Sequence, residues 1–137
     1  MEQAPAIPPA IPPADLTLDE MRPLLAAALP AHVPFDGWTM RAVDAAAADL
    51  GIPPAAARLA FPGGDIDMIE AWLDDADARM EAALDNDAFR AMKVRDKVTA
   101  AIRTRLEQAA PHREAVRRAV AILALPGNAP RAGKRAW

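Results

Sequence analysis

Hydrophobic side chains recur at three- and four-residue spacing along most of this sequence, which is the period of a helix that faces a core. The longest run begins at Asp65, keeps the spacing for about five turns, and has its apolar positions at Ile69, Trp72, Leu73, Ala76, Met80, Ala83 and Leu84. Two further runs cover about 93–109 and 112–125. No segment alternates with a period of two over a convincing length, so the sequence predicts an all-α fold.

These two later runs also predict which side chains face inward. For 93–109 the inward positions are Val94, Val98, Ala101, Ile102 and Leu106. For 112–125 they are Val116, Ala119, Val120 and Leu123, with Arg113, Arg117 and Arg118 on the opposite side.

A capping box opens the first helix. Thr17 and Glu20 have the Thr-x-x-Glu spacing in which a hydroxyl and a carboxylate satisfy free amides of the first turn. Pro30 and Pro34 mark the end of this helix or a bend in it.

Two shorter helices follow the first. Thr39 is a good N-cap for a helix over 40–50, and Gly51 stops it. Pro53 and Pro54 then open a short helix that runs through Leu59 or Ala60. Three helices with a glycine turn between the second and third form a helix-turn-helix pattern.

The chain divides into four parts by composition. Residues 1–14 hold five prolines and are expected to be disordered. Residues 15–64 form the helix-turn-helix-like three-helix unit, and 65–130 the amphipathic helices, which the family resemblance described below implies are a partial ligand-binding core. Residues 131–137 form a basic tail.

The sequence offers little for catalysis or metal binding. Cysteine is absent, and neither His32 nor His112 stands at a spacing that implies a triad, so both are expected at the surface. A carboxylate stripe on the 65–84 helix has no histidine beside it, so it is interpreted as a solvated face; its members are Asp67, Glu70, Asp74, Asp77 and Glu81. We therefore expect no enzyme activity, no catalytic residue, no metal and no cofactor.

Charge is divided along the chain. Residues 15–91 carry 5 Lys and Arg against 15 Asp and Glu, whereas residues 92–137 carry 11 against 3. One interpretation is that complementary helices of one domain attract each other, or that the division arises by chance in solvated faces. The other is that the basic part approaches an anionic surface such as phospholipid headgroups or an acidic partner.

Several segments carry a family resemblance. The three-helix unit followed by a long helix looks like the N-terminal part of the TetR repressor fold. More closely, "GWTMRAVDAAAADLGIPPAAARLAFPGGDIDMIEAWLDDADARM", "KVRDKVTAAIRTRLE" and "RRAVAILALPGNAP" resemble the ubiquinone (coenzyme Q) biosynthesis accessory proteins, which keep a TetR-like fold but bind lipid. The likeness runs from about 16 to 130, and family members continue beyond the position of Trp137 through helices that complete the lipid cavity.

The resemblance implies a non-catalytic protein that binds isoprenoid quinone lipid and presents it to the di-iron quinone hydroxylase of the pathway. It also implies a homodimer, cytoplasmic and peripheral to the inner face of the membrane, with membrane contact through the basic C-terminal part. The lipid-binding residues are then expected among the inward positions of the last three helices: Met68, Trp72, Met80, Val98, Ile102, Leu106, Val120 and Leu123.

A TetR-type transcriptional regulator that binds DNA is the alternative. Helices that read DNA use cationic and amide side chains on bases and phosphates. Between residues 36 and 64 the cations are Arg41 and Arg58, against Asp36, Asp44 and Asp49. This negative balance argues against nucleic acid as a partner, and the alanines at 55–57 are expected to permit close helix packing.

Overall fold

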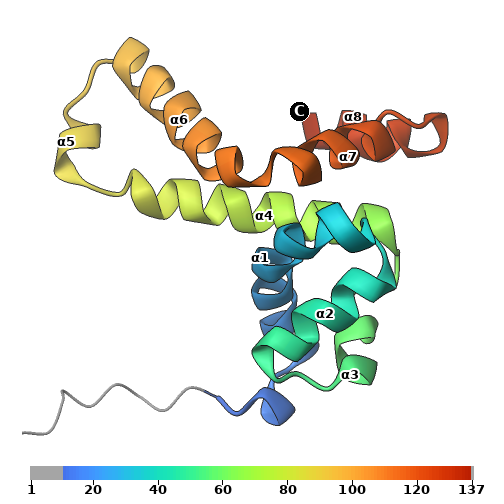
Figure 1. Ribbon diagram of the computed structural model, residues 1–137. Helices are drawn as coiled ribbons and strands as arrows, with labels where there is room; N and C mark the ends of the chain where they lie inside the picture. Colours follow the sequence, from blue (N-terminus) through green and yellow to red (C-terminus); the bar gives the residue numbers. More distant parts are fainter. Residues whose placement is uncertain (1–10, 137) are drawn as a thin grey trace, which may run out of the picture.

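The computed structural model describes residues 11–136, and this part of the chain contains helices and no strand, which confirms the all-α prediction. The helices are α1 (Leu18–Asp36), α2 (Met40–Leu50), α3 (Pro54–Leu59), α4 (Asp65–Ala83), α5 (Asp87–Arg90), α6 (Val94–Ala109), α7 (Arg113–Leu123) and α8 (Ala129–Ala136), with 3-10 turns at Pro13–Asp15, Ala110–His112 and Pro126–Asn128. Figure 1 shows α4 across the middle of the molecule, with α1–α3 on one side of it and α6–α8 on the other.

The two predicted tails are described only in part. Of the proline-rich segment 1–14, residues 1–10 lie outside the described residues, and a 3-10 turn begins at Pro13. The basic segment 131–137 lies in α8 as far as residue 136. Trp137 lies outside the described residues.

The predicted capping box of α1 is confirmed. The Glu20 backbone N–H donates to the Thr17 hydroxyl oxygen at 3.2 Å, and the Thr17 N–H donates to the Glu20 carboxylate at 3.0 Å. These bonds lower the pKa of Glu20 below its ordinary value, because they favour the charged form.

The prolines do not end α1, which continues through Pro30 and Pro34 to Asp36. A proline inside a helix removes a backbone hydrogen bond and costs about 3 kcal/mol. Pro30 is fully buried between Leu29 and Val33, and burial of this apolar stretch offsets that cost.

The last turn of α1 accepts two hydrogen bonds from another helix. The Arg118 guanidinium of α7 donates to the backbone oxygens of Val33 and Pro34 at 3.1 and 3.3 Å. A cation at a helix C-terminus also favours the helix dipole. The turn that contains Pro34 is therefore held by α7.

The predicted helix-turn-helix elements are confirmed. The Thr39 hydroxyl oxygen accepts the Ala42 N–H at 3.4 Å. Gly51 adopts the left-handed conformation, with φ 70° and ψ 21°, that ends α2 and that a side chain would strain. In α3, Ala57 is fully buried and packs α3 onto α2, whereas Ala55 is exposed.

The core lies between α1, α2, α3 and the first half of α4, and two alanines of α7 close it. Trp38 and Trp72 meet there with ring centroids 5.3 Å apart, and the Trp38 indole N–H donates to the Ala115 backbone oxygen at 3.2 Å. The small side chains of Ala115 and Ala119 let α7 approach the tryptophans closely. One apolar core therefore joins the three-helix unit to α4 and α7.

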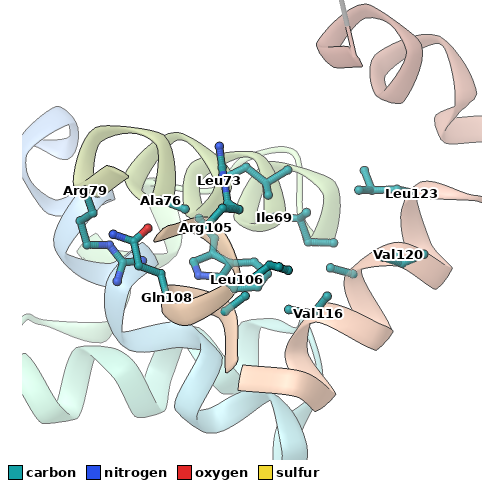
Figure 2. Close-up of a pocket in the computed structure, with 13 residues that line it drawn as sticks. Ile69, Leu73, Ala76, Arg79, Arg105, Leu106, Gln108, Val116, Val120 and Leu123 are labelled. Carbon is teal, nitrogen blue, oxygen red and sulfur yellow. The ribbon is translucent and has the colours of Figure 1, made fainter. Parts of the chain in front are cut away.

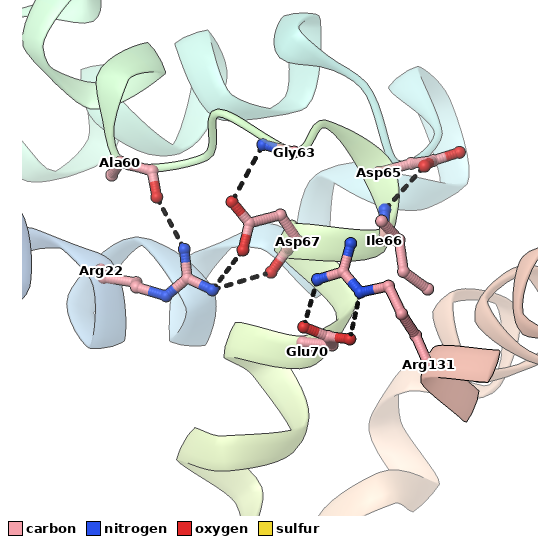
Figure 3. Close-up of polar contacts among 8 residues, drawn as sticks. All are labelled: Arg22, Ala60, Gly63, Asp65, Ile66, Asp67, Glu70 and Arg131. Carbon is pink, nitrogen blue, oxygen red and sulfur yellow. Dashed lines mark hydrogen bonds and ion pairs between the residues drawn. The ribbon is translucent and has the colours of Figure 1, made fainter. Parts of the chain in front are cut away.

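The acidic stripe on α4 is not a wholly solvated face, and that part of the prediction is wrong. Asp67 is only 8% exposed, and its carboxylate accepts from Arg22 at 2.5 Å and from the Gly63 N–H at 3.1 Å. Arg22 also donates to the Ala60 backbone oxygen at 2.7 Å (Figure 3). Sequence spacing grouped Asp67 with the other carboxylates of α4 but did not show that Arg22 of α1 covers it.

Other stripe carboxylates also bind cations from the basic half of the chain. Arg131 of α8 makes a two-pronged contact with Glu70 at 2.9 and 2.5 Å (Figure 3). Arg105 of α6 pairs with Asp77. These ion pairs join the basic helices α6 and α8 to the acidic helix α4, as the first interpretation of the charge division predicts.

We predict that Arg22→Leu lowers the free energy of unfolding by about 2–3 kcal/mol at pH 7, because it leaves the buried Asp67 carboxylate without its charged donor. Burial raises the pKa of Asp67, but the bonds from Arg22 and Gly63 outweigh burial and hold this pKa below its ordinary value. The stabilisation is therefore present above about pH 4 and is lost as the pH falls through the lowered pKa. Urea unfolding at several pH values measures this.

Arg90→Leu is the matched control for that experiment. Arg90 also pairs with two carboxylates, Asp85 and Asp87, but at an exposed site, so its loss is expected to cost less than about 1 kcal/mol. Equal effects of the two substitutions would show that the Arg22 contact is not a buried one.

Candidate functional site

An apolar groove of about 270 Å³ lies where α4, α6 and α7 meet. Figure 2 shows its lining side chains converging from these three helices. The lining residues are Ile69, Trp72, Leu73, Ala76, Arg79, Arg105, Leu106, Gln108, Ala109, Val116, Ala119, Val120 and Leu123. Ten of these thirteen side chains are apolar, so the groove suits an apolar ligand better than a polar one.

The groove forms because the chain changes direction at the junction of α6 and α7. The 3-10 turn at Ala110–His112 contains Pro111 and separates the two helices, which diverge from each other in Figure 1. α4 packs against both of them and forms the floor. The groove therefore opens between the end of α6 and the side of α7.

Two of the three polar lining residues, Arg79 and Gln108, lie at one end of the groove. Arg79 stands on α4 beyond Ala76, while Arg105 and Gln108 stand one turn apart on α6. In Figure 2, Arg79 and Gln108 lie at the opposite end of the groove from Leu123. A ligand that fits this groove therefore has a polar end and an apolar end.

Each of the two arginines in the lining pairs with a carboxylate. The Arg79 Nε lies 3.0 Å from an Asp75 oxygen, and Arg105 pairs with Asp77. His112 is half-buried nearby, and burial followed by the charge of Arg79 lowers its pKa below the ordinary value. His112 is therefore neutral at pH 7 and adds no positive charge.

The structure brings together half of the eight residues that the sequence predicts for a lipid site. Trp72, Leu106, Val120 and Leu123 line the groove. Met68 does not, because it is buried in the core at 1% exposure.

Three of the predicted residues lie away from the groove. Met80 faces a separate open hollow that it shares with Phe89 and Ala101. Val98 and Ile102 are more than half exposed on α6. The prediction that these two face inward is wrong, because α6 contacts α4 through a neighbouring face, on which Ala101 and Arg105 are half-buried.

Sequence reasoning missed the polar and the small residues of the groove. The sequence predicts lining residues from inward apolar positions, so it does not point to the polar side chains of Gln108, Arg79 and Arg105. The sequence does indicate that Arg105 and Gln108 share a face of α6, because residues three apart lie on one side of a helix. Ala76 and Ala119 leave the space that larger side chains would fill.

The described residues offer no metal centre, since no group of three or more His, Asp or Glu side chains within them could hold an ion. His32 bonds to a carboxylate oxygen of Asp49 at 2.5 Å. The partner lies 17 residues away in the sequence, which is why spacing did not reveal it.

The helix-turn-helix surface is a second candidate site, for nucleic acid. On α3, Arg58 donates to both carboxylate oxygens of Asp44 on α2, at 2.8 and 2.5 Å. This contact lowers the pKa of Asp44 and keeps it charged. The cation of the short helix is thus already neutralised by its own domain.

Comparison with known proteins gives no further constraint: no protein-family model and no curated protein sequence matches this chain. Among the described residues, none of the helices combines the length and the apolar character that a membrane span requires.

Proposed function

We propose that this chain is a non-catalytic lipid-binding accessory protein of ubiquinone biosynthesis, which binds isoprenoid quinone intermediates and presents them to a pathway hydroxylase. The observation that carries the proposal is the apolar groove with its polar residues at one end. Prenylated quinones have the same division, with oxygens on the ring and a hydrocarbon tail. The ring then lies toward Arg79 and Gln108, and the first tail units toward Val120 and Leu123.

An apolar stripe on α6 offers a second path for the tail, which leads from Leu106 away from α7. Its four residues follow each other at four-residue spacing and are 77%, 53%, 56% and 64% exposed: Val94, Val98, Ile102 and Leu106. Leu106 also lines the groove, so the stripe and the groove are continuous. The stripe is about 18 Å long at 1.5 Å per residue. A tail laid along it covers apolar surface that is otherwise in water.

The basic part of the chain supports the cytoplasmic, membrane-peripheral location included in this proposal. Lys93, Arg95 and Arg103 are exposed on or beside α6, and Arg113 is exposed at the start of α7. Exposed cations of this kind attract the anionic lipids of a cytoplasmic leaflet. An apolar ligand that moves between a membrane and an enzyme is best exchanged at such a surface.

Titration with a short-tailed benzoquinone is expected to quench the tryptophan emission of the protein, because Trp72 forms part of the groove wall. Ala76→Leu places extra carbons in the groove, so it weakens binding about ten-fold or more. Ala48→Leu, the same change at an exposed position of α2, leaves the affinity unchanged. Equal affinity of wild type and Ala76→Leu would exclude the groove as the binding site.

Tail length tests the role of the α6 stripe. Ile102→Ser is expected to weaken a long-tailed quinone about five-fold, because it removes apolar surface from the path, and to leave a one-isoprene analogue unaffected. Arg103→Ser, at the adjacent exposed position, is the control. The same loss for both tail lengths would show that the tail does not follow α6.

A TetR-type regulator is the second candidate, supported by the two short helices α2 and α3 and the glycine turn at Gly51 that joins them. Because Arg58 is paired with Asp44, we expect no binding of duplex DNA at physiological salt and no steep salt dependence. Fluorescence anisotropy with a random-sequence duplex and with fragments from a genomic library measures this. Nanomolar, sequence-selective binding would contradict the carrier proposal and establish the regulator.

A further inference from the structure

A second hollow lies beside the groove, at the corner where α6 meets α7. Its volume is about 460 Å³, and four apolar side chains and two arginines line it: Leu106, Ala109, Ala110, Val116, Arg113 and Arg117. Leu106, Ala109 and Val116 also line the groove, so the two spaces share these side chains. This space, which we call the corner hollow, therefore combines an apolar floor with two cations.

The arginines of the corner hollow are less neutralised than those of the groove. Residues 113–118 hold three arginines and one carboxylate, Glu114, and so carry a net charge of +2. Arg117 and Arg118 both donate to Glu114 and lower its pKa to about 2. Arg113 is exposed and forms no ion pair among the described residues. Arg117 uses Nε and Nη2 for Glu114 and keeps the donors of Nη1 for a ligand.

This lining suits a phosphate that is joined to carbon chains. Among the described residues no carboxylate lines the corner hollow, and Glu107 of α6 is exposed to solvent outside it. Guanidinium groups bind phosphate oxygens through paired N–H donors. The apolar floor gains from contact with hydrocarbon, which the sugar-phosphate backbone of a nucleic acid does not supply. A phospholipid head group meets both requirements.

The surface around the corner hollow carries exposed aliphatic side chains. Leu106 and Val120, which lie at the groove, are 64% and 60% exposed, and Ile102 on α6 is 56% exposed. Aliphatic side chains beside cations are typical of protein surfaces that lie in the head-group region of an anionic membrane. A zwitterionic head group would bring its own cation close to the arginines, so an anionic phospholipid is favoured.

We propose that the corner hollow binds the phosphate of an anionic membrane phospholipid, with Arg113 and Arg117 on the phosphate oxygens and the apolar floor against the glycerol backbone. Because the hollow and the groove share side chains, the bound head group places the groove beside the bilayer. A neutral lipid then enters the groove directly from the membrane. This inference deepens the function proposed above and rests on it for the ligand of the groove.

Co-sedimentation of the full chain with vesicles tests the phosphate contact. Wild type is expected to bind vesicles of phosphatidylcholine and phosphatidylglycerol about 25-fold more tightly than vesicles of phosphatidylcholine alone, because each of two cations contributes about five-fold. Arg113→Gln is expected to lose about five-fold in affinity for the mixed vesicles. Arg41→Gln, at an exposed position of α2, is the matched control and keeps the wild-type affinity. Equal binding by Arg113→Gln and wild type overturns the inference.

A second pair of variants separates the corner hollow from general surface charge. Ala110 lines the hollow but not the groove, so Ala110→Glu places a carboxylate against the phosphate and is expected to weaken binding of mixed vesicles about ten-fold or more. Ala48→Glu, the same change at an exposed position of α2, leaves the affinity unchanged. Equal losses in these two variants overturn the assignment to the hollow. Circular dichroism verifies that the helices of each variant are intact.

Calorimetry with soluble ligands distinguishes a lipid site from an ion site. Dihexanoyl phosphatidylglycerol, below its micelle concentration, is expected to bind wild type and to lose affinity in Arg113→Gln. Inorganic phosphate alone is expected to bind more weakly, because it makes no contact with the apolar floor. Equal affinities for the two ligands would overturn the lipid and leave an ion site. Tighter binding of an acidic peptide than of mixed vesicles would assign the surface to a protein partner and also overturn the inference.

The outcomes separate this inference from the function on which it rests. Arg113→Gln is expected to keep the affinity for a soluble short-tailed benzoquinone, because Arg113 does not line the groove. Vesicle binding that depends on Arg113, together with no quinone binding, overturns the carrier function and leaves the corner hollow standing. Quinone binding, together with vesicle binding that is insensitive to Arg113→Gln and Ala110→Glu, overturns the corner hollow and leaves the carrier function standing.

Discussion

The packing of Trp72 against Trp38 is the constraint on which the rest of the structure depends. One face of Trp72 belongs to the core of the three-helix unit, and the same side chain forms part of the groove wall. The Trp38 indole also bonds to the backbone of α7, so the two rings fix α4 and α7 relative to each other. The helix-turn-helix unit thus acts as the base that holds the groove open, which is a structural use for a motif whose cation is already paired.

Local chemistry made much of the fold predictable. The capping hydroxyls of Thr17 and Thr39 and the left-handed Gly51 act over a few residues, so their spacing in the sequence suffices to place helix boundaries. Pro30 suggested a helix end or bend, because a proline removes a backbone hydrogen bond within its own helix. The burial that offsets this loss comes from helices distant in the sequence, so the sequence alone did not show it. Periodicity likewise showed that α6 has an apolar side but not which side contacts α4.

The candidate site was half predictable for the same reason. Trp72, Leu106, Val120 and Leu123 were found because large apolar side chains on amphipathic helices converge in a helical protein. Gln108 was not found, because an unpartnered buried oxygen is a property of three-dimensional packing and leaves no mark in the spacing of residues. The groove also depends on small side chains such as Ala76, which sequence periodicity counts as ordinary core.

The opposite charges of the two halves bear on the ligand that the proposed function requires. Two cations of the basic half pair with the acidic half within the chain: Arg131 binds Glu70, and Arg105 binds Asp77. The same internal neutralisation occurs in the three-helix unit, where Arg58 binds Asp44. The arginines that line the groove and the arginine of α3 are therefore each paired with a carboxylate, which leaves less positive charge for phosphate recognition. A groove that is electrically balanced and mostly apolar gains most from a neutral lipid, whose binding adds apolar burial without disturbing the ion pairs that hold α6 and α8 to α4.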